Sequence, residues 1–167
     1  IKKLIISSAE MSPLLKSNLG IHKDYILNFQ TDSKILSLIN KKNIELYLRK
    51  GPITPDHVIR TKPKPLVINI DKCKNLEQVR KVLKEKFLNF SAEYIKYFNL
   101  NKSKKNNVKI LDTIPHIIII PNMGIFSVGN TLGESKISGD ISRMSIETIL
   151  RIEERSKFES INEKDIF

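Results

Sequence analysis

Cysteine and tryptophan are the scarcest residues of this chain: its 167 residues include one cysteine, Cys73, and no tryptophan. A lone cysteine excludes an intramolecular disulfide, and no second cysteine or histidine stands near it at the spacing of zinc ligands. Both features are typical of a protein from a reducing compartment. We therefore expect a cytoplasmic location.

Long hydrophobic runs are also missing. The longest, residues 117–120, consists of four isoleucines, whereas a helix needs about 20 apolar residues to cross a bilayer. The chain does not open with a charged segment followed by an apolar one, as a secretory signal peptide does. We expect no membrane partner.

Acidic residues are few relative to basic ones, 18 against 29, so the formal net charge is +11. Such a charge suits an anionic partner, for example a nucleic acid or a phosphorylated molecule. The lysines are scattered, however, and the densest cluster, residues 102–107, has no interleaved aromatic side chain. We interpret this cluster as a solvated loop, and nucleic-acid binding by charge alone ranks last among our hypotheses.

The pattern of apolar residues predicts one α/β domain over residues 1–167, with a layered sheet and flanking helices. Strand composition occurs at residues 25–29, 66–70, 117–120 and 125–128. A short helix is expected after Asp32, and residues 44–48 fit either element. At the beginning of the chain, Pro13 and Gly20 interrupt any regular pattern.

Two long helices have the clearest signal. The first is expected from residue 75, with large side chains three or four residues apart on one face: Leu76, Val79, Leu83, Phe87, Phe90, Tyr94 and Tyr97. The second is expected to begin with a capping box formed by Thr131 and Glu134 and to end near Arg155. Its inward face is predicted to carry Ile137, Ile141, Met144, Ile149 and Ile152.

A proline-rich stretch, residues 50–66, has the sequence KGPITPDHVIRTKPKPL and gathers polar side chains. Its prolines predict an extended crossing into the next strand. Asp56 and His57 are candidates for a catalytic base with its carboxylate, and a structural histidine is the alternative. The candidates for phosphate binding are Thr54, Arg60, Thr61 and Lys62, because their side chains donate hydrogen bonds to phosphate oxygens. An exposed basic rim explains the same residues equally well.

A second group of candidates lies in the turn PNMG, residues 121–124, where a buried strand ends. Asn122 and Gly124 line the kind of position at which open α/β sheets hold ligands. The alternative is that only the backbone angles of the turn require Gly124.

Residues 115–134, PHIIIIPNMGIFSVGNTLGE, resemble the C-terminal signature of the class II aldolase/adducin family. That signature has an apolar strand, an Asn-His-Gly turn, a short strand, a glycine, a threonine step and a long helix. Upstream, the chain resembles one branch of this family, the bifunctional rhamnulose-phosphate aldolase/short-chain dehydrogenases. The pattern of that branch is repeated in order by PDH at residues 55–57, RTK at residues 60–62 and PL at residues 65–66. The resemblance extends from about Ser7 onward. It implies an α/β/α fold and a middle, second aldolase-like segment of a longer chain.

The resemblance also implies a domain without metal chemistry of its own. In the family the turn supplies a histidine to a catalytic zinc, but Met123 stands at that position, and the family's upstream His-x-His pair is missing. No Gly-x-Gly-x-x-Gly dinucleotide motif occurs either. We therefore expect no cofactor in this segment, with zinc and NAD(P) held by other domains.

Two functions follow as expectations. The first is a degenerate aldolase-like domain of a bifunctional sugar-phosphate aldolase/dehydrogenase, which serves neighbouring domains as a scaffold, interface or substrate-side surface. The alternative is a sugar-phosphate-binding or catalytic domain that uses residues 54–62. The partners considered are neighbouring domains of the same polypeptide, a phosphorylated sugar and a second copy of the chain.

Overall fold

The computed structural model describes residues 2–20, 24–102 and 108–166. At its centre lies a four-stranded sheet with the order β1-β4-β3-β2. The strands are β1 (Ile26–Gln30), β2 (Leu66–Val67), β3 (Ile117–Ile120) and β4 (Gly124–Gly129). β2 pairs in parallel with β3, whereas the other two pairings are antiparallel. β1 and β2 therefore form the edges of the sheet.

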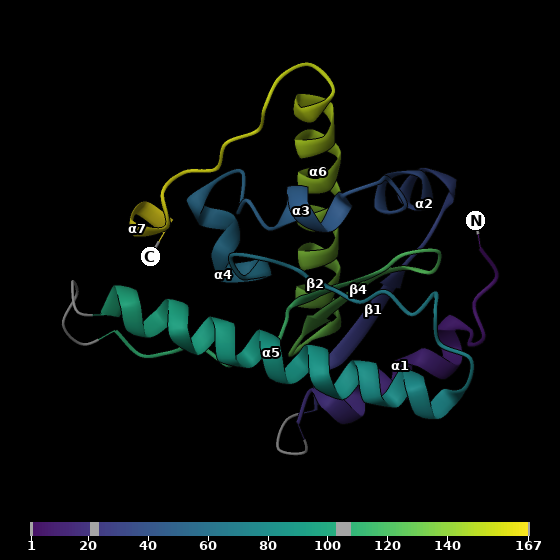
Figure 1. The fold of residues 1–167 in the computed structure, drawn as a ribbon. Coiled ribbons are helices and arrows are strands. Elements are labelled where there is room, and N and C mark those ends of the chain that lie inside the picture. The colour runs from purple at the N-terminus through teal and green to yellow at the C-terminus, as the bar shows by residue number, and fades with distance from the viewer. Residues whose placement is uncertain (1, 21–23, 103–107, 167) are drawn as a thin grey trace.

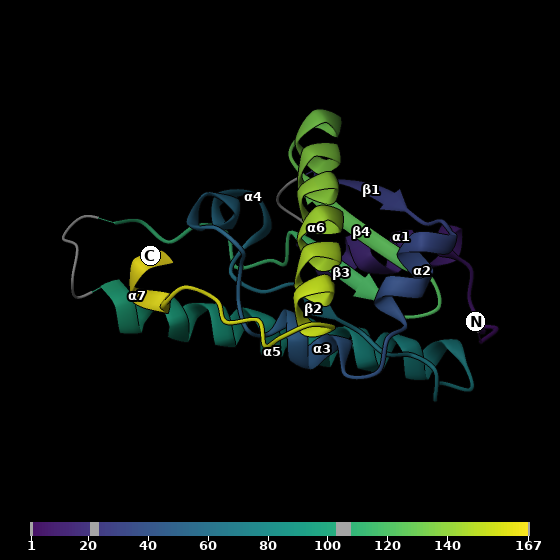
Figure 2. The ribbon, with the colours of Figure 1, turned by 90° about the horizontal axis from the view of Figure 1, so that it is seen from above.

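Helices cover both faces of this sheet (Figures 1 and 2). One face packs against α1 (Ser8–Asn18) and α5 (Leu76–Lys102), and the other against α2 (Ser33–Ile39), α3 (Ile44–Leu48) and α6 (Leu132–Glu153). The remaining helical turns are η1 (Pro55–His57), α4 (Val58–Thr61) and α7 (Glu163–Ile166). This three-layered α/β/α arrangement confirms the predicted fold class.

The sheet is buried on both faces, and this explains why β3 consists of four consecutive isoleucines. Ile118 and Ile120 pack into the core on the side of α1 and α5, whereas Ile117 and Ile119 pack into the core on the side of α6. Alternate side chains of a strand point to opposite faces, so a strand covered on both sides needs an apolar residue at every position. Each buried isoleucine contributes roughly 1.5–3 kcal/mol to folding.

Most of the predicted elements are confirmed. The strands expected at residues 25–29, 117–120 and 125–128 are present, as are the helices expected after residues 32, 75 and 131. α2 begins where the Asp32 carboxylate accepts a hydrogen bond from the Ile35 N–H at 2.7 Å. The ambiguous residues 44–48 are helical.

α1 was not expected, because Pro13 lies inside it. A capping box starts this helix: Ser7 Oγ accepts from the Glu10 N–H at 3.3 Å, and the Glu10 carboxylate accepts from the Ser7 N–H at 2.9 Å. Pro13 removes one helical hydrogen bond. The complete burial of Met11 and Leu15 in the core outweighs that loss.

The extended crossing predicted for the proline-rich stretch is wrong. Pro55 opens a 3-10 turn that continues into α4, since the fixed φ of proline suits the first position of a helix. Pro63 then ends α4, because a residue before proline avoids the α-helical region. Lys62 has a φ of 65° and a ψ of 166°, whereas the extended backbone expected before a proline has a negative φ. The following strand is also shorter than predicted and includes only Leu66 and Val67.

The inward face predicted for α6 is wrong in its first half. Ile137 and Met144 are 48% and 53% exposed. The buried residues at this end are small: Ser135, Ser138, Gly139 and Ser142. A Cβ atom on Gly139 would lie 2.8 Å from Ser127 Oγ on β4, so α6 passes too close to the sheet for a large side chain.

The basic cluster at residues 102–107 falls, apart from Lys102 at the end of α5, outside the described residues. Its interpretation as a solvated loop stays a prediction. No helix within the described part of the chain is long and apolar enough to cross a membrane.

Gly124 is expected to be irreplaceable in the turn between β3 and β4. Its φ is 154°, and an added Cβ would lie 2.6 Å from both the Gln30 carbonyl oxygen and Phe29 Cε2. We predict that Gly124→Ala lowers the free energy of unfolding by about 2 kcal/mol or more, measured by urea denaturation.

Gly133→Ala is the matched control, because the nearest atom to its new Cβ would be Thr131 Oγ1 at 3.8 Å. Since Gly133 lies in α6, alanine is expected to stabilise the protein by up to about 1 kcal/mol. Equal losses in the two variants would contradict the special role of Gly124.

Candidate functional site

Lys62 lies at the centre of the most unusual cluster of the structure. Its side chain is 0% exposed, although lysine is almost never fully buried unless it is paired. The positive φ that follows α4 turns this side chain inward, beneath α5 and toward the segment before β3. Burial therefore has to be compensated by close contacts of the ammonium group.

Two residues supply these contacts. Lys62 Nζ donates to the Asp112 carbonyl oxygen, lies 3.2 Å from Asp112 Oδ1 and stands 4.0 Å from the centre of the Tyr94 ring. A cation over an aromatic face is attracted by the ring quadrupole, most strongly when water is excluded. Burial lowers the pKa of Lys62, and the charge and hydrogen bond of Asp112 oppose this effect.

Asp112 connects Lys62 to His116. His116 Nε2 lies 3.1 Å from Asp112 Oδ1, and His116 Nδ1 lies 3.0 Å from the Arg60 carbonyl oxygen. Both neighbours of the imidazole are acceptors, so a neutral ring donates only one of these two hydrogen bonds. Burial alone raises the pKa of the Asp112 carboxyl, but His116 and Lys62 overcome this effect and hold the pKa at about 2.

We call Lys62, Tyr94, Asp112 and His116 the Lys62 network. Its members come from the end of α4, from α5 and from the approach to β3, so the network joins three segments that are distant in sequence. A fully enclosed amine has no access to a substrate. The arrangement therefore positions the proline-rich stretch on the sheet and offers no nucleophile to solvent in this conformation.

The predicted site residues of the proline-rich stretch do not converge. Asp56 and Arg60 are exposed and Thr54 is partly exposed, whereas Lys62 is enclosed. The Thr61 hydroxyl donates to the His57 carbonyl oxygen at 2.9 Å. His57 turns toward α6, where its Nδ1 lies 3.4 Å from Ser145 Oγ, and no hydrogen bond joins it to Asp56.

Sequence reasoning missed Asp112 and assigned Tyr94 only to the apolar face of α5. The available signal was the spacing of Asp112 and His116, four residues apart at the start of a buried strand. It could not reveal Lys62, because the contact between Lys62 and Asp112 spans 50 residues of sequence.

Asn122 and Gly124 lie beyond the other end of β3, whose four residues span roughly 13 Å at about 3.3 Å per residue. Asn122 secures the turn: its N–H donates to Asn40 Oδ1 at 2.7 Å, and its side-chain amide donates to Asp71 at 3.1 Å. The structure thus separates these two candidates from those of the proline-rich stretch.

Met123, which the sequence resemblance places at the histidine of the aldolase turn, belongs to the core. Its side chain is 8% exposed and packs into the cluster on the side of α1 and α5. Among the described residues, no three histidine, cysteine, aspartate or glutamate side chains gather as metal ligands would. The residues around this turn therefore do not fit a zinc ion.

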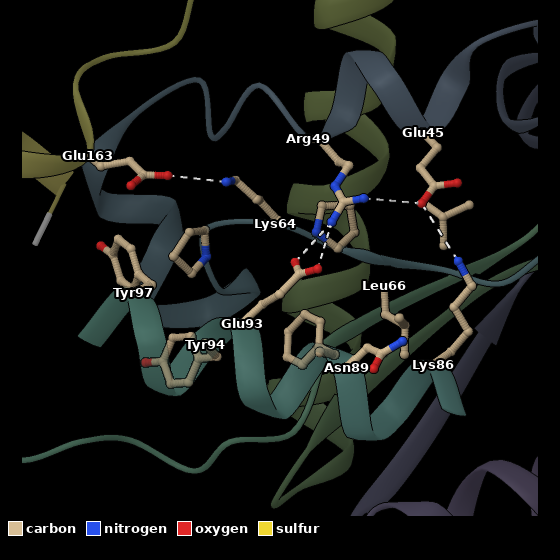
Figure 3. A pocket seen from close by; sticks show the side chains of 14 residues that line it. Glu45, Arg49, Lys64, Leu66, Lys86, Asn89, Glu93, Tyr94, Tyr97 and Glu163 are labelled. Atoms are coloured by element: carbon tan, nitrogen blue, oxygen red, sulfur yellow. Dashed lines mark hydrogen bonds and ion pairs between the residues drawn. The ribbon is translucent and has the colours of Figure 1, made fainter. Parts of the chain in front are cut away.

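A groove opens along the free edge of β2 (Figure 3). We call it the edge groove: Leu66 and Val67 form its floor, Glu45 and Arg49 of the α3 segment form one wall, and the face of α5 from Lys86 to Tyr97 forms the other. Its volume is about 210 Å³. Tyr94, whose ring also contacts Lys62, places the Lys62 network directly beside this groove.

Comparison with known proteins assigns the chain to a family. The family of class II aldolases, second domain, matches residues 7–167. The chain therefore belongs to this family, in agreement with its strand-turn-helix signature and its three-layered fold.

A curated relative, the uncharacterized oxidoreductase YuxG of Bacillus subtilis, is 24% identical over 160 residues. The match covers 95% of this chain but only 23% of the relative, so the chain spans about a quarter of that protein. Crystal structures of YgbL, a candidate aldolase/epimerase/decarboxylase, from Klebsiella pneumoniae and Escherichia coli share the fold, with TM-scores of 0.58 and 0.55 and identities of 11% and 12%. Each comparison covers 92% of this chain and 63% of YgbL.

The Lys62 network predicts a pH-dependent stability. The pKa of Asp112 falls from an ordinary 3.8 to about 2 on folding, so the ionised carboxylate contributes about 2 kcal/mol near neutral pH. Because the folded-state pKa is the lower one, this contribution is complete well above pH 4 and disappears as the pH falls toward about 2. Asp112→Asn should therefore destabilise the protein at pH 7 and much less near pH 2.

Urea unfolding of wild type and variant across this pH range measures the difference. Asp24→Asn is the control, since Asp24 is exposed and its replacement should change stability by less than about 0.5 kcal/mol. A loss in Asp112→Asn that does not depend on pH would show that the carboxylate charge is not the stabilising element.

Proposed function

We propose that this chain is a degenerate class II aldolase-like domain that works without a zinc site of its own, as a scaffold or interface domain of a longer protein. In this proposal the longer protein joins an aldolase-like part, which holds zinc, to a short-chain dehydrogenase, which holds NAD(P). The domain then positions its neighbours or borders their substrate.

One observation carries the proposal: Met123 is buried in the apolar core at the turn where the family has a histidine ligand. A thioether is a poor zinc ligand, and a side chain enclosed by apolar residues is not available to a metal. His116 is committed to Asp112 and to the Arg60 carbonyl oxygen at the opposite end of β3. The oxidoreductase name of YuxG, of which this chain matches about a quarter, supports the dehydrogenase context.

Zinc binding tests this proposal. We expect the purified chain, equilibrated with zinc and then dialysed, to retain much less than one zinc per molecule by elemental analysis.

Met123→Leu should change the free energy of unfolding by less than about 1.5 kcal/mol, because it conserves volume and polarity. Met123→His should destabilise by about 1–3 kcal/mol without gaining zinc affinity, since it buries a polar ring without ligand partners. One tightly bound zinc per wild-type chain would overturn the proposal.

A second candidate function is sugar-phosphate binding by residues 54–62. It is favoured by the exposure of Arg60 on α4, whose guanidinium can bind an anionic ligand in competition with the nearby charge of Glu134. If this function holds, a ketose phosphate raises the melting temperature of the chain, and Arg60→Ala abolishes the shift. Arg80→Ala is the control, because Arg80 is also exposed but lies on α5. An unchanged shift in Arg60→Ala would exclude this candidate.

A further inference from the structure

We propose that the edge groove binds an extended peptide segment, which adds a strand beside β2 and belongs to the same polypeptide outside residues 1–167. This inference rests on the proposed interface function and names its partner. It concerns the backbone at the free edge of the sheet, which none of the predicted site residues uses; Tyr94 of the Lys62 network lines one wall of the groove.

The backbone of Val67 is the first argument. In the parallel pairing of β2 with β3, Ile68 N–H donates to the Ile119 carbonyl oxygen at 2.9 Å. Backbone groups alternate in direction along a strand, so the Val67 N–H and C=O point away from β3 and into the groove. Within the described part of the chain, neither group has a hydrogen-bond partner, although Val67 is only 6% exposed.

A backbone donor and acceptor that face the groove without a protein partner can be satisfied only by water or by a bound chain. A strand laid beside β2 satisfies both at once, because it presents its own N–H and C=O at this spacing; such strand addition is a recurring mode of peptide recognition. The strand would be short. Pro63 and Pro65 lack N–H groups and limit pairing on one side of Val67.

The shape of the edge groove favours a single extended segment as its occupant and disfavours a second copy of the chain. Leu66 of β2 lies between the α3 segment, which carries Glu45 and Arg49, and α5 (Figure 3). A β2 edge from another copy would bring its own flanking helices into collision with these walls. A single strand without attached layers brings no such helices.

The walls also suit a polypeptide. Arg49 and Glu93 face each other across the groove with two contacts of 2.9 Å, and Lys64 pairs with Glu163 at 3.1 Å. These side chains are substantially exposed, so their pairs are weak and can open for a ligand. Balanced charges offer both donors and acceptors to a peptide, whereas they give a purely anionic ligand no net attraction.

The proteins that this chain matches are longer than the matched region, as the proposed partner segment requires. The chain matches 23% of YuxG, and 37% of each YgbL chain lies outside the 63% that it matches (100 − 63). Each therefore has further chain beyond the matched region.

Photo-cross-linking in the full-length protein tests the inference. A benzoylphenylalanine at Asn89, an exposed position that lines the groove, should cross-link to one segment outside residues 1–167. The same group at Leu88, which is exposed and does not line the groove, is the matched control and should give at least tenfold less of this product. Mixing isotopically light and heavy protein shows whether the product lies within one polypeptide or between two.

Two variants test the backbone pairing itself. Val67→Pro removes the N–H that points into the groove while sparing the bonds to β3, and should reduce the Asn89 cross-link at least tenfold. Val67→Ala shortens the same side chain but keeps the N–H, and should retain the cross-link. Products confined to residues 1–167, products between two copies, no product, or full retention in Val67→Pro would each overturn the inference. None of these outcomes alters the zinc measurement, so the proposed function stands or falls separately.

Discussion

The enclosed ammonium of Lys62 is the constraint that fixes how α4, α5 and the start of β3 pack together. A buried charge is tolerated only with close partners, and Lys62 finds them in Asp112 and in the ring of Tyr94. α4, α5 and the start of β3 must therefore stay in fixed relative positions. The network also fixes the chain leading into β2, and hence the position of the sheet edge that forms the groove floor.

The small-residue face of α6 imposes a second constraint. Because Gly139 lies against Ser127, the helix passes very close to the sheet, and the large side chains Ile137 and Met144 are displaced to the outer surface. Periodicity places Ile137 and Met144 on one side of the helix but does not say which side faces the sheet. Hydrophobicity alone predicts that the large residues face the sheet. The helix-to-sheet distance decides otherwise, because only small residues fit where the helix packs closely.

Local signals in the sequence predicted the elements whose structure is determined locally. Four isoleucines identify a strand covered on both faces, and Asp32 and Thr131 mark helix starts through their own hydrogen bonds. The helical turn at Pro55 was missed because proline suits both extended chain and a helix start. For the candidate site, the residue types were recognised but not their assembly, since the contact between Lys62 and Asp112 depends on how α4 and β3 meet in space.

The turn at Met123 shows which parts of the family signature the fold itself requires. The turn requires Gly124 for its backbone, and Asn122 secures it through Asn40 and Asp71. Neither requirement involves the side chain at position 123, so a core methionine satisfies the fold at a position where metal chemistry needs a ligand. The turn, which is the most recognisable part of the signature, is therefore evidence for the fold and not for a metal site. Evidence for what the domain does has to come from groups that the fold itself leaves unsatisfied, and the backbone of Val67 at the edge of β2 is such a group.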